Sequence, residues 1–337
     1  MNRAQIVNHG LHRGHMLKEA LLDNGVLSLS LLNVGAVTRD LRLSHRGESR
    51  PLVLGFRDPA EYLVNPGYLG VIAGRVSGRI KDASFAHEGN LVRLVANEGR
   101  NQLHGGPVGL SHVLWEIEPL SETSARLSYH SPEGENGFPG TVEFSVTVTL
   151  DGLAVDYVMT AAVSRSTPIS LAQHSYYNLS GGQHPIWDHR LQVDATGYLV
   201  LDDTNVPMGQ IADLLGTRYD LRFGRSFGEL DPQHLGTDIN LVFDGDRDAA
   251  LPVATLTAPD GLQMSVITNQ PGAQVYTASA LGRHPGGLLG QTIGPAMGVC
   301  FEPQGFPNAV NLPQFPSVLV TPDRPYSQTL RLEFGWI

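Results

Sequence analysis

One segment limits the possible folds of this chain more than any other. Residues 141–150, Thr-Val-Glu-Phe-Ser-Val-Thr-Val-Thr-Leu, alternate strictly between polar and apolar side chains. A two-residue period in β-branched and aromatic residue types is typical of a strand with one buried face. The turn dipeptide Asp151-Gly152 follows, and residues 153–163 form a second apolar-rich run. The pattern predicts an antiparallel hairpin, and therefore a fold with at least one antiparallel sheet.

Short strand patterns recur along most of the 337 residues, separated by turns to which 38 glycines and 22 prolines contribute. Helical periodicity is scarce, and we expect only short helical turns, near residues 211–215 and 227–230. No repeat of fixed period indicates a propeller, and no linker divides the chain. We therefore predict an all-β fold in which one large antiparallel β-sandwich domain spans residues 16–337, preceded by a loose leader over residues 1–15.

The composition argues against several classes of partner. A formal net charge of −10 opposes binding to nucleic acid, whose partners concentrate positive charge. No stretch approaches the ~20 apolar residues of a membrane span, and the first residues contain no apolar run typical of a signal peptide. The single cysteine, Cys300, cannot form an internal disulfide. We expect a cytoplasmic protein that binds neither nucleic acid nor membranes.

Glu302 is the residue whose local sequence most favours a catalytic role. Alternation places Val299 and Phe301 on one face of a short strand and Cys300 and Glu302 on the other, so the carboxylate has a defined direction. Pro303 lacks a backbone donor, so the strand is expected to end just past the carboxylate and to lead into a rigid loop. A glutamate held there is a candidate base. The alternative is a glutamate on an edge strand that points into water.

Four further polar residues occur where strands meet turns or glycine-rich loops. Each has a structural explanation when taken alone. Residues such as His104 and His174 are more often packing residues, one such as Asp238 more often forms a turn, and one such as Arg79 more often belongs to a surface ion pair. Their number, rather than any one of them, suggests a site.

Several motifs, in this order along the chain, resemble the aldose 1-epimerase (galactose mutarotase) family. They are Tyr68-Leu69-Gly70, Gly74-Arg75-Val76-Ser77-Gly78-Arg79-Ile80, Leu103-His104-Gly105-Gly106, His174-Ser175-Tyr176-Tyr177-Asn178-Leu179 and Phe301-Glu302-Pro303-Gln304-Gly305-Phe306-Pro307-Asn308-Ala309-Val310-Asn311. The resemblance extends from about residue 24 to the carboxyl end. It implies the β-supersandwich fold of that family and interconversion of the α and β anomers of a free aldose, without a metal or another cofactor.

The resemblance also implies roles for individual residues. Glu302 matches the general base of the family and His174 its general acid. The remaining matches are expected to hold the sugar or to lie beside it: Arg79, His104, Tyr176, Asp238 and Gln274. Two positions depart from the common family pattern, because Gly78 stands where an asparagine is frequent and Ile239 where a histidine is frequent. These departures leave the preferred aldose open.

The proposed chemistry requires one base and one acid. The base removes the proton of the anomeric hydroxyl while the acid protonates the ring oxygen, and closing the ring reverses both transfers. We expect Glu302 to be ionised and His174 protonated. The aldose is the one partner that this chemistry needs, and the sequence is compatible with a monomer or a homodimer.

Other readings of the sequence have weaker support. The 13 histidines show no His-Glu-x-x-His spacing, no Gly-x-Ser-x-Gly motif is present, and the glycine-rich runs lack the strand-to-helix context of a nucleotide loop. Two alternatives stay open: a non-catalytic carbohydrate-binding or regulatory protein on the same fold, and an epimerase of a modified or phosphorylated sugar. A phosphorylated substrate would call for an additional basic cluster.

Overall fold

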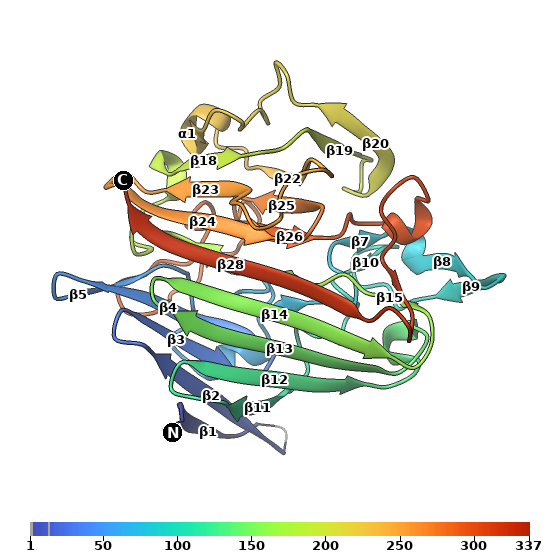
Figure 1. Ribbon diagram of the computed structural model, residues 1–337, viewed down its shortest axis with the longest axis horizontal. Coiled ribbons are helices and arrows are strands. Elements are labelled where there is room, and N and C mark those ends of the chain that lie inside the picture. Colours follow the sequence, from blue (N-terminus) through green and yellow to red (C-terminus); the bar gives the residue numbers. More distant parts are fainter. Residues whose placement is uncertain (1–2, 13) are drawn as a thin grey trace.

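The hairpin expected from residues 141–163 lies within a nine-stranded antiparallel sheet of the computed structural model, which describes residues 3–12 and 14–337. Figure 1 shows β12, β13, β14 and β28 side by side across the front of the molecule. In spatial order the strands of this sheet are β11 (Glu116–Pro119), β12 (Ser124–Ser131), β13 (Val142–Asp151), β14 (Ala154–Val163), β28 (Tyr326–Trp336), β24 (Leu262–Thr268), β23 (Ala254–Thr257), β18 (Arg190–Val193) and β21 (Arg225–Ser226).

The register of the β13–β14 pair confirms the predicted hairpin. Val142 is opposite Val163 and Asp151 is opposite Ala154, so every residue of β13 has a partner on β14. Gly152 adopts a φ of 56°, which the tight connection requires and which glycine adopts without strain. The strict alternation of the sequence therefore reports both the strand and its pairing.

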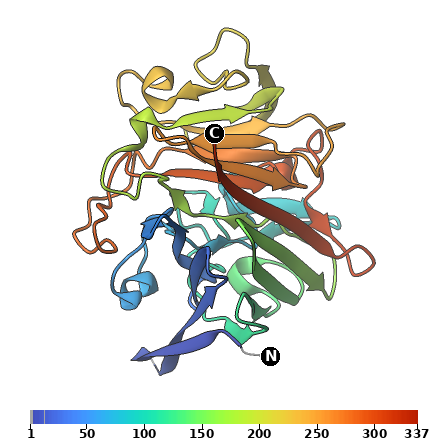
Figure 2. The same cartoon turned by 60° about the vertical axis from the view of Figure 1, so that its left-hand side comes forward.

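Two further sheets complete the main architecture. The five-stranded sheet runs β1 (Gln5–His12), β2 (His15–Asp23), β3 (Leu27–Leu32), β4 (Val37–His45) and β5 (Glu48–Pro51). The six-stranded sheet runs β17 (Tyr176–Tyr177), β26 (Val299–Gln304), β25 (Gly272–Tyr276), β22 (Asp238–Val242), β19 (Gly197–Leu201) and β20 (Pro207–Asp213). Figure 2 shows the amino-terminal strands at one end of the molecule and the yellow segments, which include α1 and β20, at the other, with β28 crossing between them.

The remaining elements are short. Four two-stranded ladders pair β6 (Ile72–Ala73) with β16 (Ala172–Gln173), β7 (Arg79–Ile80) with β10 (Gln102–Leu103), β8 (Ser84–His87) with β9 (Asn90–Arg93), and β15 (Thr167–Pro168) with β27 (Leu319–Val320). The helices are α1 (Phe227–Leu230) and the 3₁₀ turns η1 (Pro59–Leu63), η2 (Lys81–Ala83), η3 (Glu135–Gly137), η4 (Ile186–Asp188) and η5 (Ala309–Asn311). The helical turn expected near 227–230 is confirmed, whereas the one near 211–215 is wrong because β20 runs through residue 213.

One apolar cluster joins the three main sheets. Leu29 of β3, Val146 of β13 and Phe301 of β26 all belong to it, so the inward faces of these sheets share a core. Burial of this apolar surface is the main favourable term in folding. Among the described residues, no helix has the length and apolar character needed to cross a membrane.

The expectation of a loose leader over residues 1–15 is wrong for most of that segment. Residues 5–12 form β1, which pairs with β2 from Gln5 opposite Leu21 to His12 opposite His15. Ile6 packs against the core, and the His9 Nε2 atom lies 2.7 Å from a carboxylate oxygen of the buried Glu19. A strand at a sheet edge exposes most of its side chains, so its sequence carries little hydrophobic periodicity.

Candidate active site

A cavity of about 590 Å³ opens beside the six-stranded sheet and is lined on its other sides by segments from all four quarters of the chain. Its volume is within the range of small-molecule sites. All seven residues singled out from the sequence line this cavity: Arg79, His104, His174, Tyr176, Asp238, Gln274 and Glu302. The fold therefore brings together residues that are up to 223 positions apart, from residue 79 to residue 302.

Glu302 projects from an interior strand into this cavity. β26 lies between β17 and β25, and all six of its residues are buried. Phe301 faces the apolar core while Glu302, with 2% of its surface exposed, faces the cavity. The predicted alternation is confirmed, and the alternative of an edge strand facing water is wrong. The strand also continues past Pro303 to Gln304, because its pairing with β25 runs on, with Ala273 opposite Pro303 and Gly272 opposite Gln304.

His174 lies directly beside Glu302, in the short connection between β16 and β17. Its backbone is held at both ends, because its N–H donates to the Val71 carbonyl and its carbonyl accepts from the Gly70 N–H. The Nε2 atom of the ring is 3.5 Å from Oε1 of Glu302. A side chain that can donate a proton and one that can accept it thus meet at the base of the cavity.

Burial has opposite effects on the pKa values of these two groups. It lowers the pKa of His174 to about 4, and it raises the pKa of Glu302 well above its usual range, with a further increase from the nearby Asp238 carboxylate. Both effects favour the neutral forms. The ionised Glu302 and protonated His174 expected from the sequence are therefore not what the protein environment alone stabilises.

Cys300 contacts the other ring nitrogen of His174. Its Sγ atom lies 3.5 Å from Nδ1, and burial raises the thiol pKa well above its usual range, so the thiol keeps its proton. The ligand atoms of Cys300, His174 and Glu302 lie within 4.8 Å of one another, a spacing that on its own suggests a metal site. However, the thiol and the carboxylate approach different ring nitrogens, whose lone pairs diverge. The three side chains do not converge on one ion.

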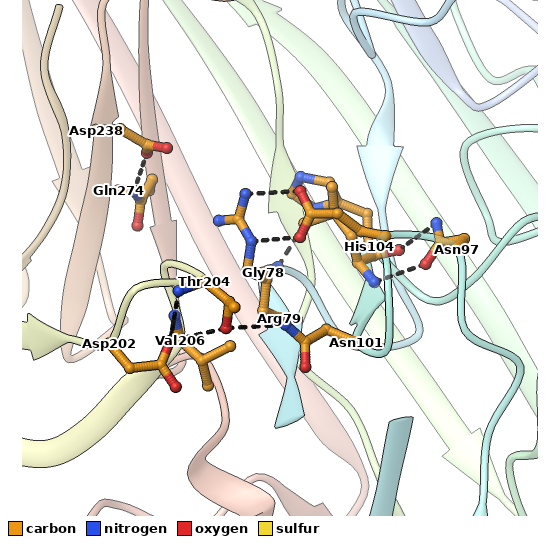
Figure 3. A network of polar contacts seen from close by, with 12 residues as sticks. Gly78, Arg79, Asn97, Asn101, His104, Asp202, Thr204, Val206, Asp238 and Gln274 are labelled. Carbon is orange, nitrogen blue, oxygen red and sulfur yellow. Dashed lines mark hydrogen bonds and ion pairs between the residues drawn. The ribbon is translucent and has the colours of Figure 1, made fainter. Parts of the chain in front are cut away.

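Arg79 and Glu98 form the clearest ion pair of the cavity. Nε of Arg79 donates to Oε2 of Glu98 over 2.6 Å, and Nη2 donates to Oε1 over 2.8 Å. Figure 3 shows this paired arrangement, with the third guanidinium nitrogen on the side of Arg79 that faces Asp238 and Gln274. Glu98 also lines the cavity, although nothing in its local sequence marks it as a site residue.

His104 reaches the cavity from the loop after β10. It has a φ of 50°, and its Nδ1 atom accepts a hydrogen bond from the Gly78 N–H over 3.3 Å. Since Nδ1 is an acceptor there, the neutral ring carries its proton on Nε2. Burial and the nearby His174 hold the pKa of His104 well below its usual range. His104 is therefore a neutral hydrogen-bond donor. Gly105 allows this loop to pass, because a Cβ at that position would lie 1.9 Å from the Gly74 carbonyl oxygen.

A row of polar side chains crosses three strands of the six-stranded sheet. Gln274 is opposite Asn240 on one side and Glu302 on the other. The Gln274 amide donates to Asp238 over 2.5 Å, and burial raises the pKa of Asp238. This register fixes the relative positions of the base candidate and the groups expected to bind a sugar.

The two departures from the family pattern have different consequences in the structure. Ile239 is buried in the apolar core, so its side chain does not line the cavity. Gly78 does line it, with a φ of 69°, and a Cβ there would lie 2.7 Å from the Pro307 ring. The wall of the cavity is therefore made of bare backbone at residue 78.

Several cavity residues were not assigned a role from the sequence. Tyr68 lies inside the first of the motifs, and its ring centroid is 4.8 Å from that of His104. Asn240 and Gln304 line the cavity two positions after Asp238 and Glu302. Strand alternation places residues i and i+2 on one face, so this rule would have identified the last two.

The chain is similar to known proteins along most of its length. Residues 18–333 match the protein family described as Aldose 1-epimerase. The chain is 37% identical to a galactose mutarotase of Sus scrofa over 320 residues, which is 93% of each protein. It is 36% identical to a galactose mutarotase of Homo sapiens over 328 residues, which is 96% of this chain and 95% of the human protein. The chain belongs to the aldose 1-epimerase family.

Membership in this family makes the protein an isomerase that acts on aldoses. Solved structures confirm the predicted fold. An aldose epimerase homologue from C. elegans superposes with a TM-score of 0.90 at 27% identity, covering 95% of this chain and 99% of that one. A galactose 1-epimerase from Lactobacillus acidophilus superposes with a TM-score of 0.87 at 24% identity, covering 100% of this chain and 99% of that one. Both confirm the all-β architecture with large antiparallel sheets.

Proposed function

We propose that this protein interconverts the α and β anomers of a free aldose such as glucose or galactose, with Glu302 as the general base and His174 as the general acid. The observation that carries the assignment of roles is the 3.5 Å contact between Oε1 of Glu302 and Nε2 of His174 at the base of a sugar-sized cavity. A base and an acid this close can act on the two oxygens bonded to C1 of the sugar, the hydroxyl oxygen O1 and the ring oxygen O5.

The reaction needs two proton transfers in each direction. Glu302 takes the proton of the anomeric hydroxyl, the C1–O1 bond becomes a carbonyl, the C1–O5 bond breaks, and His174 gives its Nε2 proton to O5. Rotation about the C1–C2 bond then presents the other face of the carbonyl. O5 attacks that face, His174 recovers its proton and Glu302 returns the first one to O1. No atom is gained or lost.

The electrostatics of the site suit this sequence of steps. Ring opening converts the ionised Glu302 and protonated His174 into a neutral pair, and the neutral forms are those that burial favours. A bound sugar would stabilise the ionised pair at the start of the reaction by donating hydrogen bonds to the carboxylate. The transfer of protons therefore proceeds toward a state that the buried site stabilises.

The other cavity residues have the chemistry to orient the sugar. Arg79 and His104 present N–H donors, while Asp238 presents carboxylate acceptors and Gln274 an amide. The Tyr176 hydroxyl already donates to the Gly67 carbonyl over 2.7 Å, so this residue offers its ring rather than its hydroxyl. We assign these five residues to substrate binding.

Polarimetry tests this proposal. Purified protein is expected to accelerate the decay of optical rotation of freshly dissolved α-D-glucose or α-D-galactose, and a panel of pentoses, deoxysugars and sugar phosphates would identify the preferred aldose. His174→Asn is expected to reduce kcat ~10²-fold, the usual contribution of a general acid. A wild-type protein that leaves every rotation decay unchanged would contradict the proposal. The cytoplasmic location and the monomeric or homodimeric state remain predictions from the sequence.

A further inference from the structure

The ion pair between Arg79 and Glu98 uses only one edge of the guanidinium group. Nε and Nη2 are both engaged by the two carboxylate oxygens, at 2.6 and 2.8 Å. Within the part of the chain that the structure describes, Nη1 has no hydrogen-bond partner. A planar guanidinium held at two points can no longer rotate, so the direction of the third nitrogen is also determined.

Glu98 is itself held in a stiff loop. The side chain of Asn97 both accepts from the Leu103 N–H, over 2.7 Å, and donates to the Leu103 carbonyl, over 3.0 Å. The Asn101 N–H donates to the Glu98 carbonyl over 3.0 Å. Leu103 is in turn the residue opposite Arg79 in the β7–β10 ladder. Both partners of the ion pair are thus attached to the same β7–β10 ladder.

A second carboxylate competes for the same arginine. After Glu98, Asp238 contributes most to the electrostatic attraction on Arg79, ahead of Asp202, which is already paired with Lys81. No hydrogen bond joins the side chains of Asp238 and Arg79. Asp238 comes from β22 of the six-stranded sheet, whereas Arg79 comes from β7 and Glu98 from the loop between β9 and β10, and all three side chains line the cavity. Without Glu98, the attraction to Asp238 would draw the guanidinium into the space that a sugar needs.

We propose that Glu98 is a positioning residue that holds Arg79 against the loop between β9 and β10. In this position the free Nη1 of Arg79 points toward the hydroxyl groups of the aldose, and the guanidinium group is kept from pairing with Asp238. This inference rests on the proposed function and adds a residue to it. Because Arg79 is assigned to holding the sugar and not to proton transfer, its loss should affect the bound sugar and the transition state alike. Such uniform binding changes KM and leaves kcat almost unchanged.

The test compares two carboxylates with the same pairing geometry. Glu98→Gln removes the charge, and we expect KM to rise about 10-fold with kcat within about 2-fold of the wild type. Asp220→Asn is the matched control, because Asp220 also pairs with Nε and Nη2 of an arginine, Arg222, at 2.8 Å for both contacts, but lies outside the cavity. The control is expected to leave KM and kcat unchanged.

A double-mutant cycle separates positioning from a general structural role. Arg79→Ala is expected to raise KM by a similar factor, and adding Glu98→Gln to it should have little further effect, because Glu98 acts through Arg79. Independent, multiplying effects on KM would overturn the inference, as would an unchanged KM in Glu98→Gln or a fall in kcat alone. Thermal unfolding of each variant checks that the fold is retained.

The inference remains testable if the proposed function fails. A wild-type protein without mutarotase activity would refute the reaction, not the role of Glu98. Binding of D-galactose and D-glucose would then be measured by titration calorimetry. The dissociation constant of Glu98→Gln is expected to be about 10-fold higher than that of Asp220→Asn. Equal dissociation constants in the two variants would contradict the positioning role.

Discussion

Strands β26 and β28 obey the same two-residue period but use their second face differently. Along β28 buried residues alternate with more exposed ones, and the outward Arg331 pairs with Asp156 at 2.6 Å and Glu333 at 2.7 Å. Along β26 both faces are buried, and Glu302 lies on the face toward the cavity. Its neighbour there is His174, which burial keeps neutral, so this contact is not an ion pair. The charged side chains of β28 are thus paired with opposite charges and accessible to water, whereas the Glu302 carboxyl of β26 has neither a cationic partner nor access to water. The protein accepts this cost at the strand that carries the proposed base.

Replacing one glutamate on each strand by glutamine should give the largest difference between β26 and β28. Glu302→Gln keeps the shape of the side chain but cannot accept a proton, so we expect kcat to fall by about 10²- to 10⁴-fold. Glu333→Gln, on the outward face of β28, is the matched control and should retain wild-type kcat. Polarimetry with the preferred aldose measures both. Full activity in Glu302→Gln would show that another group is the base.

The same substitution should change stability in the opposite direction. Below pH 4.5 the Glu302 carboxyl is protonated in both the folded and the unfolded chain. As the pH rises, the unfolded chain loses this proton first, because burial raises the pKa in the folded state. Folding stability therefore falls with rising pH, and Glu302→Gln removes this loss. Urea unfolding at pH 7 should find the inactive variant more stable than the wild type.

His174, the proposed general acid, should make folding stability depend on pH in the acidic range. Burial lowers the pKa of His174 to about 4, from an ordinary value of 6.5, so the unfolded chain takes up a proton before the folded one. Stability is expected to fall by up to about 3 kcal/mol as the pH falls from 6.5 to 4, and His174→Asn removes that loss. Urea unfolding at pH 7 and pH 4.5 measures the difference.

His189 provides a control for this prediction. It is a buried histidine outside the cavity, and burial also lowers its pKa to about 4. His189→Asn is expected to reduce the acid sensitivity of folding in the same way while leaving kcat unchanged. If only His174→Asn reduced the acid sensitivity of folding, burial would not be the cause.

The third prediction uses the like charge near the base. Asp238 is the second cause of the raised pKa of Glu302, after burial. Asp238→Asn should therefore shift the acidic limb of the kcat/KM profile to lower pH, because the ionised base forms more easily without a neighbouring carboxylate. KM should also rise, since Asp238 is assigned to the sugar. A limb that stays in place would mean that burial alone sets this pKa.

Much of the fold was predictable because its signals are local. The alternation of residues 141–150 was sufficient for the hairpin, and that of residues 299–302 was sufficient for the direction of Glu302. All seven residues predicted for the site line the cavity. They could be identified because the chain resembles one family in several separated motifs that occur in the same order.

What the sequence did not reveal depends on distant partners. The β1 edge strand has few buried side chains of its own, and the role of Glu98 becomes visible only when its loop meets Arg79. Burial favours the neutral forms of Glu302 and His174 over the ionised pair expected from the sequence, because desolvation depends on the three-dimensional surroundings of each side chain and not on its neighbours in the chain. Residue chemistry could thus be anticipated, whereas the electrostatic environment could not.

The smallest expected effect lies on β28 itself. Asp156 is about one third exposed and shares Arg331 with Asp151 and Glu333, so water and the remaining carboxylates can replace it. Asp156→Asn should lower the free energy of unfolding by less than about 1 kcal/mol, by less still in high salt, and should leave KM unchanged. Urea unfolding at low and high ionic strength measures this. A loss of several kcal/mol would show that Arg331 behaves as a member of a buried ion pair, in which removing one partner leaves an uncompensated charge. The charged groups of β28 would then be as sensitive to the loss of a partner as Glu302 of β26, and the contrast between the two strands would disappear.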